Sequence, residues 1–239
     1  MIKLKVLIKT IVDNEVYDNR FQSTWGLSLY IEVHERSTFT LLFDVDSSFR
    51  IWKYNAELLD IDPSIINAIV ISHWHGDHAG PLGEVLKFIG KAVPVYVPIE
   101  PYMKRYRVIR NMIVCNEPCN IYDNIFTTGT MGIHIREQAL IINRSSDLII
   151  VVGCSHPGIN NIVEWAQDLT GIDRVKLVIG GLHISSWNEG LYIAKRLKQL
   201  GVEYVSPMHC TGSRAKEAIK QIFMDKYIVN GSGKTINIS

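Results

Sequence analysis

The sequence predicts an α/β fold, and two observations carry this prediction. A unit of apolar strand, histidine-bearing loop and helix recurs at residues 69–89, 148–169, 176–200 and 202–223. This alternation is typical of α/β folds, whose sites lie at the carboxyl ends of the strands. The chain also has 239 residues, 47% of them hydrophobic and 21% charged, which is enough for one sizeable core. We therefore expect a single domain over residues 1–239.

The N-terminal part of the chain predicts strands followed by a helix. Apolar residues alternate with lysines over residues 2–9, which is the period of a half-buried strand and not the continuous apolar block of a signal peptide. After a polar loop, residues 26–33 and 38–45 predict a hairpin around a short polar turn. A helix is expected next, with Ser47 or Ser48 as its N-terminal cap.

A short apolar strand at residues 69–71 leads into the most informative stretch of the sequence. Four side chains able to bind a metal follow it within six positions, namely His73, His75, Asp77 and His78. One histidine at a strand end is usually an ordinary core or surface residue, but four such side chains together favour a metal site. Imidazole and carboxylate without cysteine suit a catalytic Zn²⁺ or Mn²⁺ site better than a closed structural one. Residues 73 and 75 point to the same side of an extended segment and residues 77 and 78 begin the next turn, so this loop can serve two metals.

Further strand-to-loop junctions follow in the second half of the chain. Short strands are predicted at residues 132–136, 139–143, 148–152, 176–179 and 202–205. The last three end in loops that carry His156, His183 and His209 respectively, and a helical pattern follows each loop. These histidines are therefore expected at one edge of a sheet.

Net charge and cysteine content limit the partners and the compartment. Lys and Arg number 25 against 24 Asp and Glu, a net charge of +1, so neither nucleic-acid nor membrane binding is expected. No stretch approaches the length of a membrane span, and we expect a cytoplasmic protein. Four cysteines are too few for a disulfide scaffold. Cys115 and Cys119 are expected to be an incidental pair, with a local disulfide or half of a metal site as the alternatives.

The HxHxDH motif after an apolar strand resembles the signature of the metallo-β-lactamase fold superfamily. The resemblance implies a four-layer αββα sandwich with metals at one edge of its two sheets. It also implies the ligands of two metal sites. These are His73, His75 and His156 for the first metal, and Asp77, His78 and His209 for the second.

The sequence departs from the superfamily pattern after the third of these strands. Many dinuclear members have an aspartate there that bridges both metals, whereas this chain has Gly180-Gly181-Leu182-His183. Asp173 precedes the strand and is expected at its opposite end. A tightly bridged hydrolytic pair of metals is therefore not expected. His183 is a candidate to ligate a metal or to donate to a phosphoryl oxygen, with a supporting role as the alternative.

A narrower resemblance is to the branch named after 7,8-dihydropterin-6-methyl-4-(β-D-ribofuranosyl)aminobenzene 5'-phosphate synthase. The segments that resemble it are residues 54–59, 153–158, 180–183 and 207–212. The branch implies methanopterin-type cofactor biosynthesis, in which an arylamine displaces diphosphate from a hydroxymethyl-dihydropterin diphosphate and a metal neutralises the departing charge. The branch tends to have Asp-Thr-Gly where this chain has Asp44-Val45-Asp46, so a differently shaped loop is expected there.

The candidates for catalysis and substrate binding lie in the loop of residues 73–78, here called the metal loop, and in segments expected near it. Asp77 and His183 are the candidate catalytic residues. The candidates for binding a phosphorylated small-molecule substrate are Lys104, Arg105 and Arg107 for the phosphates, and Tyr102 and Trp74 for stacking. Residues 102–107 could also be a solvated helix face, because a charge cluster alone is weak evidence. One or two divalent metals per chain are expected, with Zn²⁺ first and Mn²⁺ or Mg²⁺ as alternatives.

The main alternative function is a zinc-dependent hydrolase of a phosphoester, lactone or thioester, in which Asp77 also accepts a proton. A diiron oxidoreductase would be expected to have a glutamate in place of His75. A nuclease would be helped by a basic exosite that the balanced charge does not reveal. A metal-binding module without catalysis is the remaining contrast.

Overall fold

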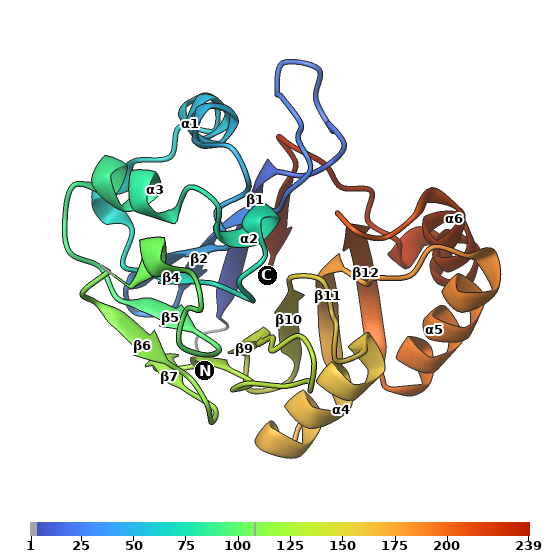
Figure 1. The fold of residues 1–239 in the computed structure, drawn as a ribbon. Helices are drawn as coiled ribbons and strands as arrows, with labels where there is room; N and C mark the ends of the chain where they lie inside the picture. Colours follow the sequence, from blue (N-terminus) through green and yellow to red (C-terminus); the bar gives the residue numbers. More distant parts are fainter. Residues whose placement is uncertain (1–3, 108) are drawn as a thin grey trace. The chain divides into compact units, whose positions relative to one another are not determined.

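The computed structural model of the chain describes residues 4–107 and 109–239, and of Arg105 only the backbone. The chain divides into two compact units, one built from Met1–Asn116 with Asn230–Ser239 and the other from Glu117–Val229. Each unit contains one β-sheet with helices packed against it (Figure 1). The mixed α/β fold is confirmed, and the single domain over residues 1–239 stays a prediction.

The sheet of the first unit has the strand order β13-β1-β2-β3-β4-β5-β6 among the described residues. Its strands are β1 (Lys5–Val12), β2 (Ser28–His34), β3 (Thr38–Phe43), β4 (Ala68–Val70), β5 (Val95–Val97), β6 (Met112–Val114) and β13 (Thr235–Ile238). The predicted hairpin is the antiparallel pair β2 and β3. From β3 to β6 the strands are parallel, so the segments that follow β3, β4 and β5 leave the sheet at one edge.

The helices of the first unit cover one face of this sheet. They are α1 (Phe49–Leu58), α2 (Gly76–Ala79), α3 (Leu82–Ile89), and the 3₁₀ turns η1 (Pro63–Ile65) and η2 (Lys104–Tyr106). Trp52 of α1 and Val85 of α3 are fully buried in one apolar cluster with Ile69 of β4. This packing fixes the metal loop, because that loop connects β4 to α3.

The predicted cap of α1 is half right. Ser48 occupies the N-cap position, but its side chain makes no capping hydrogen bond. Instead the backbone N–H of Ser48 donates to Oδ2 of Asp46 at 3.1 Å. The carboxylate before the helix thus satisfies the N–H of the N-cap residue, which is a different contact from the one expected of the serine hydroxyl.

The sheet of the second unit has the strand order β12-β11-β10-β9-β8-β7 among the described residues. Its strands are β7 (Asn120–Tyr122), β8 (Ile125–Thr127), β9 (Leu140–Asn143), β10 (Leu148–Val152), β11 (Val175–Gly181) and β12 (Val202–Met208). The strands β10, β11 and β12 are parallel, so the three histidine-bearing loops leave the sheet at the same edge. Asp173 precedes β11, at the opposite end of that strand, as expected.

The strand predicted at residues 132–136 is wrong. Met131 and Glu137 form an isolated antiparallel bridge, and the residues between them make a tight loop. Gly132 has a φ of +86°, and a Cβ there would lie 2.5 Å from the carbonyl oxygen of Ile135. Only glycine fits this close approach, so the apolar alternation of the segment is overridden by its turn.

Three helices cover one face of the second sheet, as predicted. They are α4 (Ile159–Thr170), α5 (Trp187–Gln199) and α6 (Ser213–Phe223), and the 3₁₀ turn η3 (Met224–Lys226) follows them. Val163, Leu197 and Phe223 pack from these helices into one apolar cluster with the strands. Among the described residues, no helix combines the length and the apolar character needed to span a membrane.

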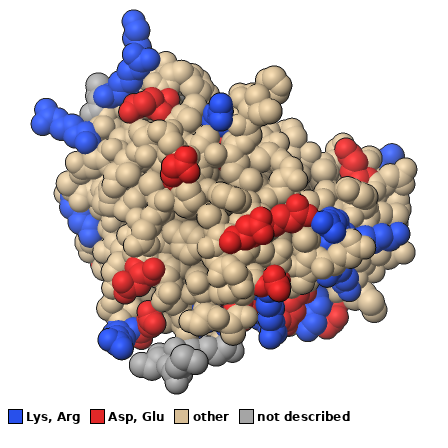
Figure 2. Space-filling model, turned by 90° about the horizontal axis from the view of Figure 1, so that it is seen from below, with Lys and Arg blue, Asp and Glu red and all other residues tan. Residues whose placement is uncertain are grey.

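Two of the four cysteines are disulfide-bonded. Cys115 and Cys119 are disulfide-bonded in the connection between β6 and β7, so the expectation of an incidental pair is wrong. Cys154 and Cys210 are not disulfide-bonded. On the face drawn in Figure 2, basic and acidic side chains are interspersed, in keeping with the net charge of +1.

Candidate functional site

The first group of candidate ligands lies where β4 ends. Nε2 of His73 is 3.0 Å from Nδ1 of His75, and the two rings are 4.5 Å apart between centroids. Two nitrogens at about 2.0–2.1 Å from a tetrahedral zinc ion lie roughly 3.3 Å from each other. The spacing of His73 and His75 therefore suits two ligands of one ion.

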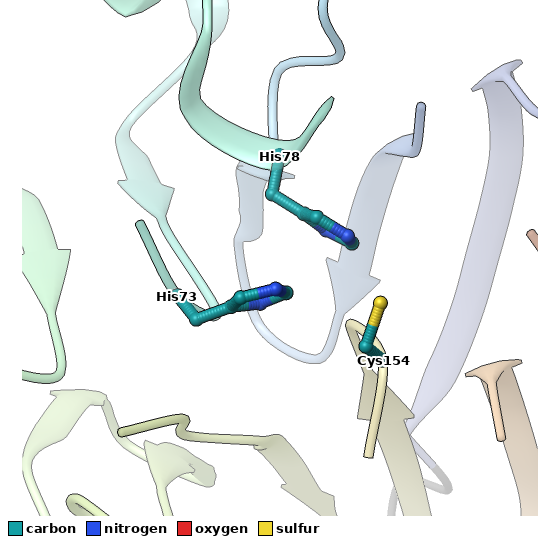
Figure 3. Close-up of side chains that lie close together, drawn as sticks. All are labelled: His73, His78 and Cys154. Atoms are coloured by element: carbon teal, nitrogen blue, oxygen red, sulfur yellow. The ribbon is translucent and has the colours of Figure 1, made fainter. Parts of the chain in front are cut away.

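His78 and Asp77 make a second pair on α2. Nε2 of His78 is 3.8 Å from Oδ2 of Asp77. The rings of His73 and His78 are 4.2 Å apart and point to the same side of the loop (Figure 3). Both rings are fully buried, which removes them from bulk water and from the ordinary surface role of histidine. The loop thus presents two pairs of donors side by side, as its spacing predicts.

Asp44, at the end of β3, holds these imidazoles in place. Its carboxylate accepts hydrogen bonds from the backbone N–H and the hydroxyl of Ser72, each at 2.7 Å. The same hydroxyl lies 2.9 Å from Nδ1 of His73, and Oδ2 of Asp44 lies 2.7 Å from Nδ1 of His78. A carboxylate beside Nδ1 fixes the proton there and leaves Nε2 free to bind a metal. Asp44 was not among the predicted site residues, although its place at a strand end was a usable signal.

A differently shaped loop is expected after Asp44 because aspartate stands at residue 46, where the branch tends to have glycine. The backbone angles of Asp46 do not support this reason. Asp46 has a φ of +69°, in the left-handed region that glycine adopts readily. Its carboxylate occupies the space over Gly26, where a Cβ would lie 1.9 Å from Oδ1 of Asp46. The carboxylate of Asp46 thus lies where a side chain at residue 26 would lie, and its position requires glycine there.

Two tryptophans near the metal loop differ in their surroundings. Trp74 is 2% exposed, its ring stacks on Tyr106 at 4.8 Å, and its indole N–H donates to the carbonyl of Ile99. This burial argues against the predicted stacking of substrate on Trp74. Trp25 is 63% exposed, and its indole N–H donates to Oδ2 of Asp77 at 3.0 Å. Sequence reasoning missed Trp25, because nothing in its local pattern links it to a residue 52 positions away.

The segment predicted to bind phosphate is the turn η2 and its flanks. Tyr102 is 57% exposed, and its hydroxyl donates to the backbone carbonyl of Trp74 at 3.1 Å. Lys104 and Arg107 are exposed, and Nε of Arg107 donates to the carbonyl of Pro101. The side chain of Arg105 lies outside the described residues. The segment is thus tied to the metal loop through Tyr102, and its binding of phosphate stays a prediction.

In the second unit, a buried carboxylate shapes the loop after β10. Glu137 is 1% exposed and accepts hydrogen bonds from the backbone N–H groups of Cys154, Ser155 and His156, at 2.8 Å, 2.9 Å and 2.8 Å. Ser155 has a φ of +59°, and its hydroxyl donates to the carbonyl of Gly181 on β11. Sequence reasoning missed Glu137 because it acts only through these tertiary contacts.

The histidines of the second unit gather at the ends of β10, β11 and β12. The rings of His156 and His183 are 4.5 Å apart. His183 and His209 have φ values of +50° and +48°, which are rare for residues other than glycine and typical of strained functional loops. Cys154 and Cys210 lie among these histidines. Potential ligand atoms of Cys154, His156 and His183 lie within 4.8 Å of one another, and so do those of Cys154, His209 and Cys210.

The environment of Cys210 favours its thiolate. A hydrogen bond with the Cys154 side chain is the main cause that lowers the pKa of Cys210 to about 5, and His209 and His183 contribute to the shift while burial opposes it. The structure thus assembles His73, His75, Asp77 and His78 within the first unit, and His156, His183 and His209 within the second. A metal shared by the two groups stays a prediction.

Comparisons with known proteins agree with the fold. Residues 40–118 match the metallo-beta-lactamase superfamily. The chain is 30% identical to the 7,8-dihydropterin-6-methyl-4-(beta-D-ribofuranosyl)-aminobenzene-5'-phosphate synthase of Methanocaldococcus jannaschii, over 92% of this chain and 92% of that protein. It is 26% identical to the uncharacterized protein MJ0448 of the same organism, over 97% of this chain and 100% of that protein.

Two solved structures illustrate the structural similarity. Tm1679, a metal-dependent hydrolase of the beta-lactamase superfamily, superposes with a TM-score of 0.80 at 27% identity, over 98% of this chain and 99% of that one. The short form of human tRNase Z superposes with a TM-score of 0.61 at 13% identity, over 96% and 98% of the chains. The second similarity concerns the fold alone.

Proposed function

The chain belongs to the metallo-β-lactamase superfamily, and from this premise we propose that it is a metal-dependent enzyme that joins a dihydropterin diphosphate to an arylamine. The observation that carries the proposal is the 30% identity, over 92% of each chain, to a protein named as a synthase of this kind. The sequence at the end of β11 and just after it supports the proposal, because no carboxylate stands at residues 180–183 to bridge a hydrolytic pair of metals.

The donor set fits divalent metal. In this proposal His73, His75 and His156 hold one ion, and Asp77, His78 and His209 hold a second. The 3.0 Å separation of the His73 and His75 nitrogens supports the first assignment, and the contact of Asp44 with Nδ1 of His78 supports the second. Zn²⁺ suits these donors, with Mn²⁺ and Mg²⁺ as alternatives. When bound, the metal neutralises charge on the departing diphosphate.

The reaction is a substitution at the methylene carbon of the pterin. The arylamine nitrogen forms a C–N bond, the C–O bond to diphosphate breaks, and diphosphate leaves with the electron pair. The proton released from nitrogen passes to a base, for which Asp77 is our candidate. His183, whose ring lies 4.5 Å from that of His156, is the candidate donor to a phosphoryl oxygen.

Substrate binding is assigned to the segment that contacts the metal loop. The hydroxyl of Tyr102 donates to the carbonyl of Trp74, which places this exposed ring beside the loop. Lys104 and Arg107 are exposed cations of the same segment, and we assign them, with Arg105, to the phosphates of the substrate.

The test is a direct assay of coupling. Purified protein is incubated with 6-hydroxymethyl-dihydropterin diphosphate, an arylamine and Zn²⁺, Mn²⁺ or Mg²⁺ in turn, and both coupled product and released diphosphate are measured. We expect equal amounts of the two products, and loss of both in the His75→Ala variant. Absence of coupled product with all three metals would refute the synthase.

A hydrolase is the second candidate, and the TM-score of 0.80 at 27% identity to a protein named as a metal-dependent hydrolase favours it. In that case the metal lowers the pKa of a bound water from about 15.7 towards 7, and the substrate is a phosphoester, lactone or thioester. Turnover of a chromogenic phosphodiester or a lactone, abolished in His75→Ala, would support hydrolysis. The absence of such turnover, together with coupling activity, would exclude it.

A further inference from the structure

We propose that Cys154 and Cys210 bind metal as thiolates, so that the second unit contributes sulfur as well as nitrogen ligands. The proposal deepens the metal-dependent function proposed above and rests on it. It also names the class of ion, because sulfur ligands select thiophilic metals such as Zn²⁺ and Fe²⁺ over Mg²⁺ and Mn²⁺.

The positions of the two cysteines in the sheet support this proposal. Cys154 follows β10 and Cys210 follows β12, and both strands pair in parallel with β11. The two thiols therefore lie at the same sheet edge as the three histidines of this unit. Neither cysteine is disulfide-bonded, Cys154 is 3% exposed, and Sγ of Cys210 lies 3.8 Å from the carbonyl oxygen of Cys154.

The distances are those of a site that needs little adjustment. The ligand atoms of Cys154, His209 and Cys210 lie within 4.8 Å of one another. In a tetrahedral zinc site, sulfur at about 2.3 Å and nitrogen at about 2.0–2.1 Å from the ion lie roughly 3.3–3.8 Å from each other. Rotation about the Cα–Cβ bond of each cysteine moves its Sγ atom and can bring the three ligand atoms to these distances.

Gly181 provides the space for one of these sulfurs. A Cβ at residue 181 would lie 2.5 Å from the carbonyl oxygen of Gly153 and 2.6 Å from Sγ of Cys210. A side chain at residue 181 and the thiol of Cys210 therefore exclude each other. The backbone of Gly153 and the thiol of Cys210 together occupy the room that a carboxylate on residue 181 would need, and both require glycine at the end of β11.

The surroundings of the thiols differ from those of ordinary buried cysteines. A structural cysteine packs among apolar side chains and stays inert. Cys154 lies instead beside His156 and His183, and Cys210 lies beside His209. Two sulfurs facing several imidazoles form a donor set that fits a thiophilic ion.

The test uses Co²⁺ as a spectroscopic probe of the full-length, reduced protein. Thiolate ligation gives a sulfur-to-cobalt charge-transfer band in the near ultraviolet, which imidazole and carboxylate do not produce. We expect this band in the unmodified chain, a weaker band in Cys154→Ser and in Cys210→Ser, and loss of the band in the double variant. The matched control is Cys115→Ser with Cys119→Ser, which replaces the disulfide-bonded pair and should leave the band unchanged.

X-ray absorption of the zinc-loaded, unmodified chain removes any dependence on the folding of the variants. A zinc–sulfur distance of about 2.3 Å, beside zinc–nitrogen at about 2.0–2.1 Å, is the expected result. Metal bound through nitrogen and oxygen alone, or a Cys154–Cys210 disulfide that persists in the metal-loaded protein, would overturn the thiolate proposal and leave the proposed function standing. Failure of the unmodified chain to bind either metal would overturn both.

Discussion

Oδ2 of Asp44 lies 2.7 Å from Nδ1 of His78, and both side chains are fully buried. The two residues come from different parts of the chain, 34 positions apart, and meet because β3 and β4 are parallel neighbours. Asp44 also receives two hydrogen bonds from Ser72, the residue before His73. A single carboxylate thus orients the imidazole of His78 directly and, through Ser72, that of His73.

This relationship predicts that Asp44→Asn weakens metal binding without removing a ligand. The amide is neutral and makes His78 a weaker donor, and such supporting contacts are worth about 10–100-fold in metal affinity. Competition with a chromophoric chelator measures the change. Asp62→Asn is the control, because Asp62 caps the exposed turn η1 and asparagine caps equally well. Equal metal affinity in Asp44→Asn and the unmodified chain would contradict the role given to Asp44.

Trp25 leads to a prediction about the substrate. Its exposed ring is held by the hydrogen bond from its indole N–H to Asp77, so it presents a fixed aromatic face beside a proposed metal ligand. Stacking between aromatic rings is worth about 0.5–1.5 kcal/mol. Trp25→Ala should therefore raise the KM for a dihydropterin substrate roughly 2- to 12-fold. Trp25→Phe keeps an aromatic face but loses the indole N–H that fixes it, so its KM should lie between those of the unmodified chain and Trp25→Ala.

The control for Trp25 is another exposed tryptophan. Trp187 is 38% exposed at the start of α5, and Trp187→Ala should leave the KM unchanged. Steady-state kinetics of the coupling reaction measures all three variants. An equal KM in Trp25→Ala and Trp187→Ala would exclude Trp25 as a stacking partner.

The sequence predicted those parts of the site that depend on local pattern. The alternation of strand, loop and helix predicted β4, β10, β11 and β12, and the close spacing of His73 to His78 predicted that these donors lie together. The contacts that hold the donors could not be predicted, because Asp44, Trp25 and Glu137 act on residues far away in the chain. Trp74 shows the opposite error, since the sequence offers it as a stacking partner for the substrate whereas its ring is packed in the core.

The contact between Gly26 and Asp46 predicts a coupled pair of substitutions. Gly26→Ala places a Cβ where Oδ1 of Asp46 lies, and such overpacking costs about 1–3 kcal/mol of unfolding free energy. Asp46→Gly removes that carboxylate and suits the φ of +69° at residue 46. In the Gly26→Ala variant, Asp46→Gly should therefore recover part of the loss, reduced by the hydrogen bond from the Ser48 N–H that this substitution also removes. Urea denaturation of the two single variants and the double variant measures the coupling, and strictly additive changes would show that the two residues do not interact.

The buried carboxylate of Glu137 holds the loop that carries Cys154 and His156, so we expect these side chains to depend on it. One oxygen accepts the N–H groups of Cys154 and Ser155, and the other accepts that of His156. In Glu137→Gln the amide oxygen can keep the first pair, but its NH₂ group then faces the N–H of His156, donor against donor. An unsatisfied buried group of this kind costs about 1–3 kcal/mol, which urea denaturation can measure.

The comparison for Glu137 is Glu164→Gln, which loses only a half-exposed ion pair with Arg196. Such pairs contribute about 0–1 kcal/mol, so this control should change little. Glu137→Gln should also weaken metal binding, because the backbone that carries Cys154 and His156 loses its fixed position. A loss of stability without a loss of metal affinity would limit Glu137 to folding, whereas equal stability in the two variants would show that its three hydrogen bonds are not needed.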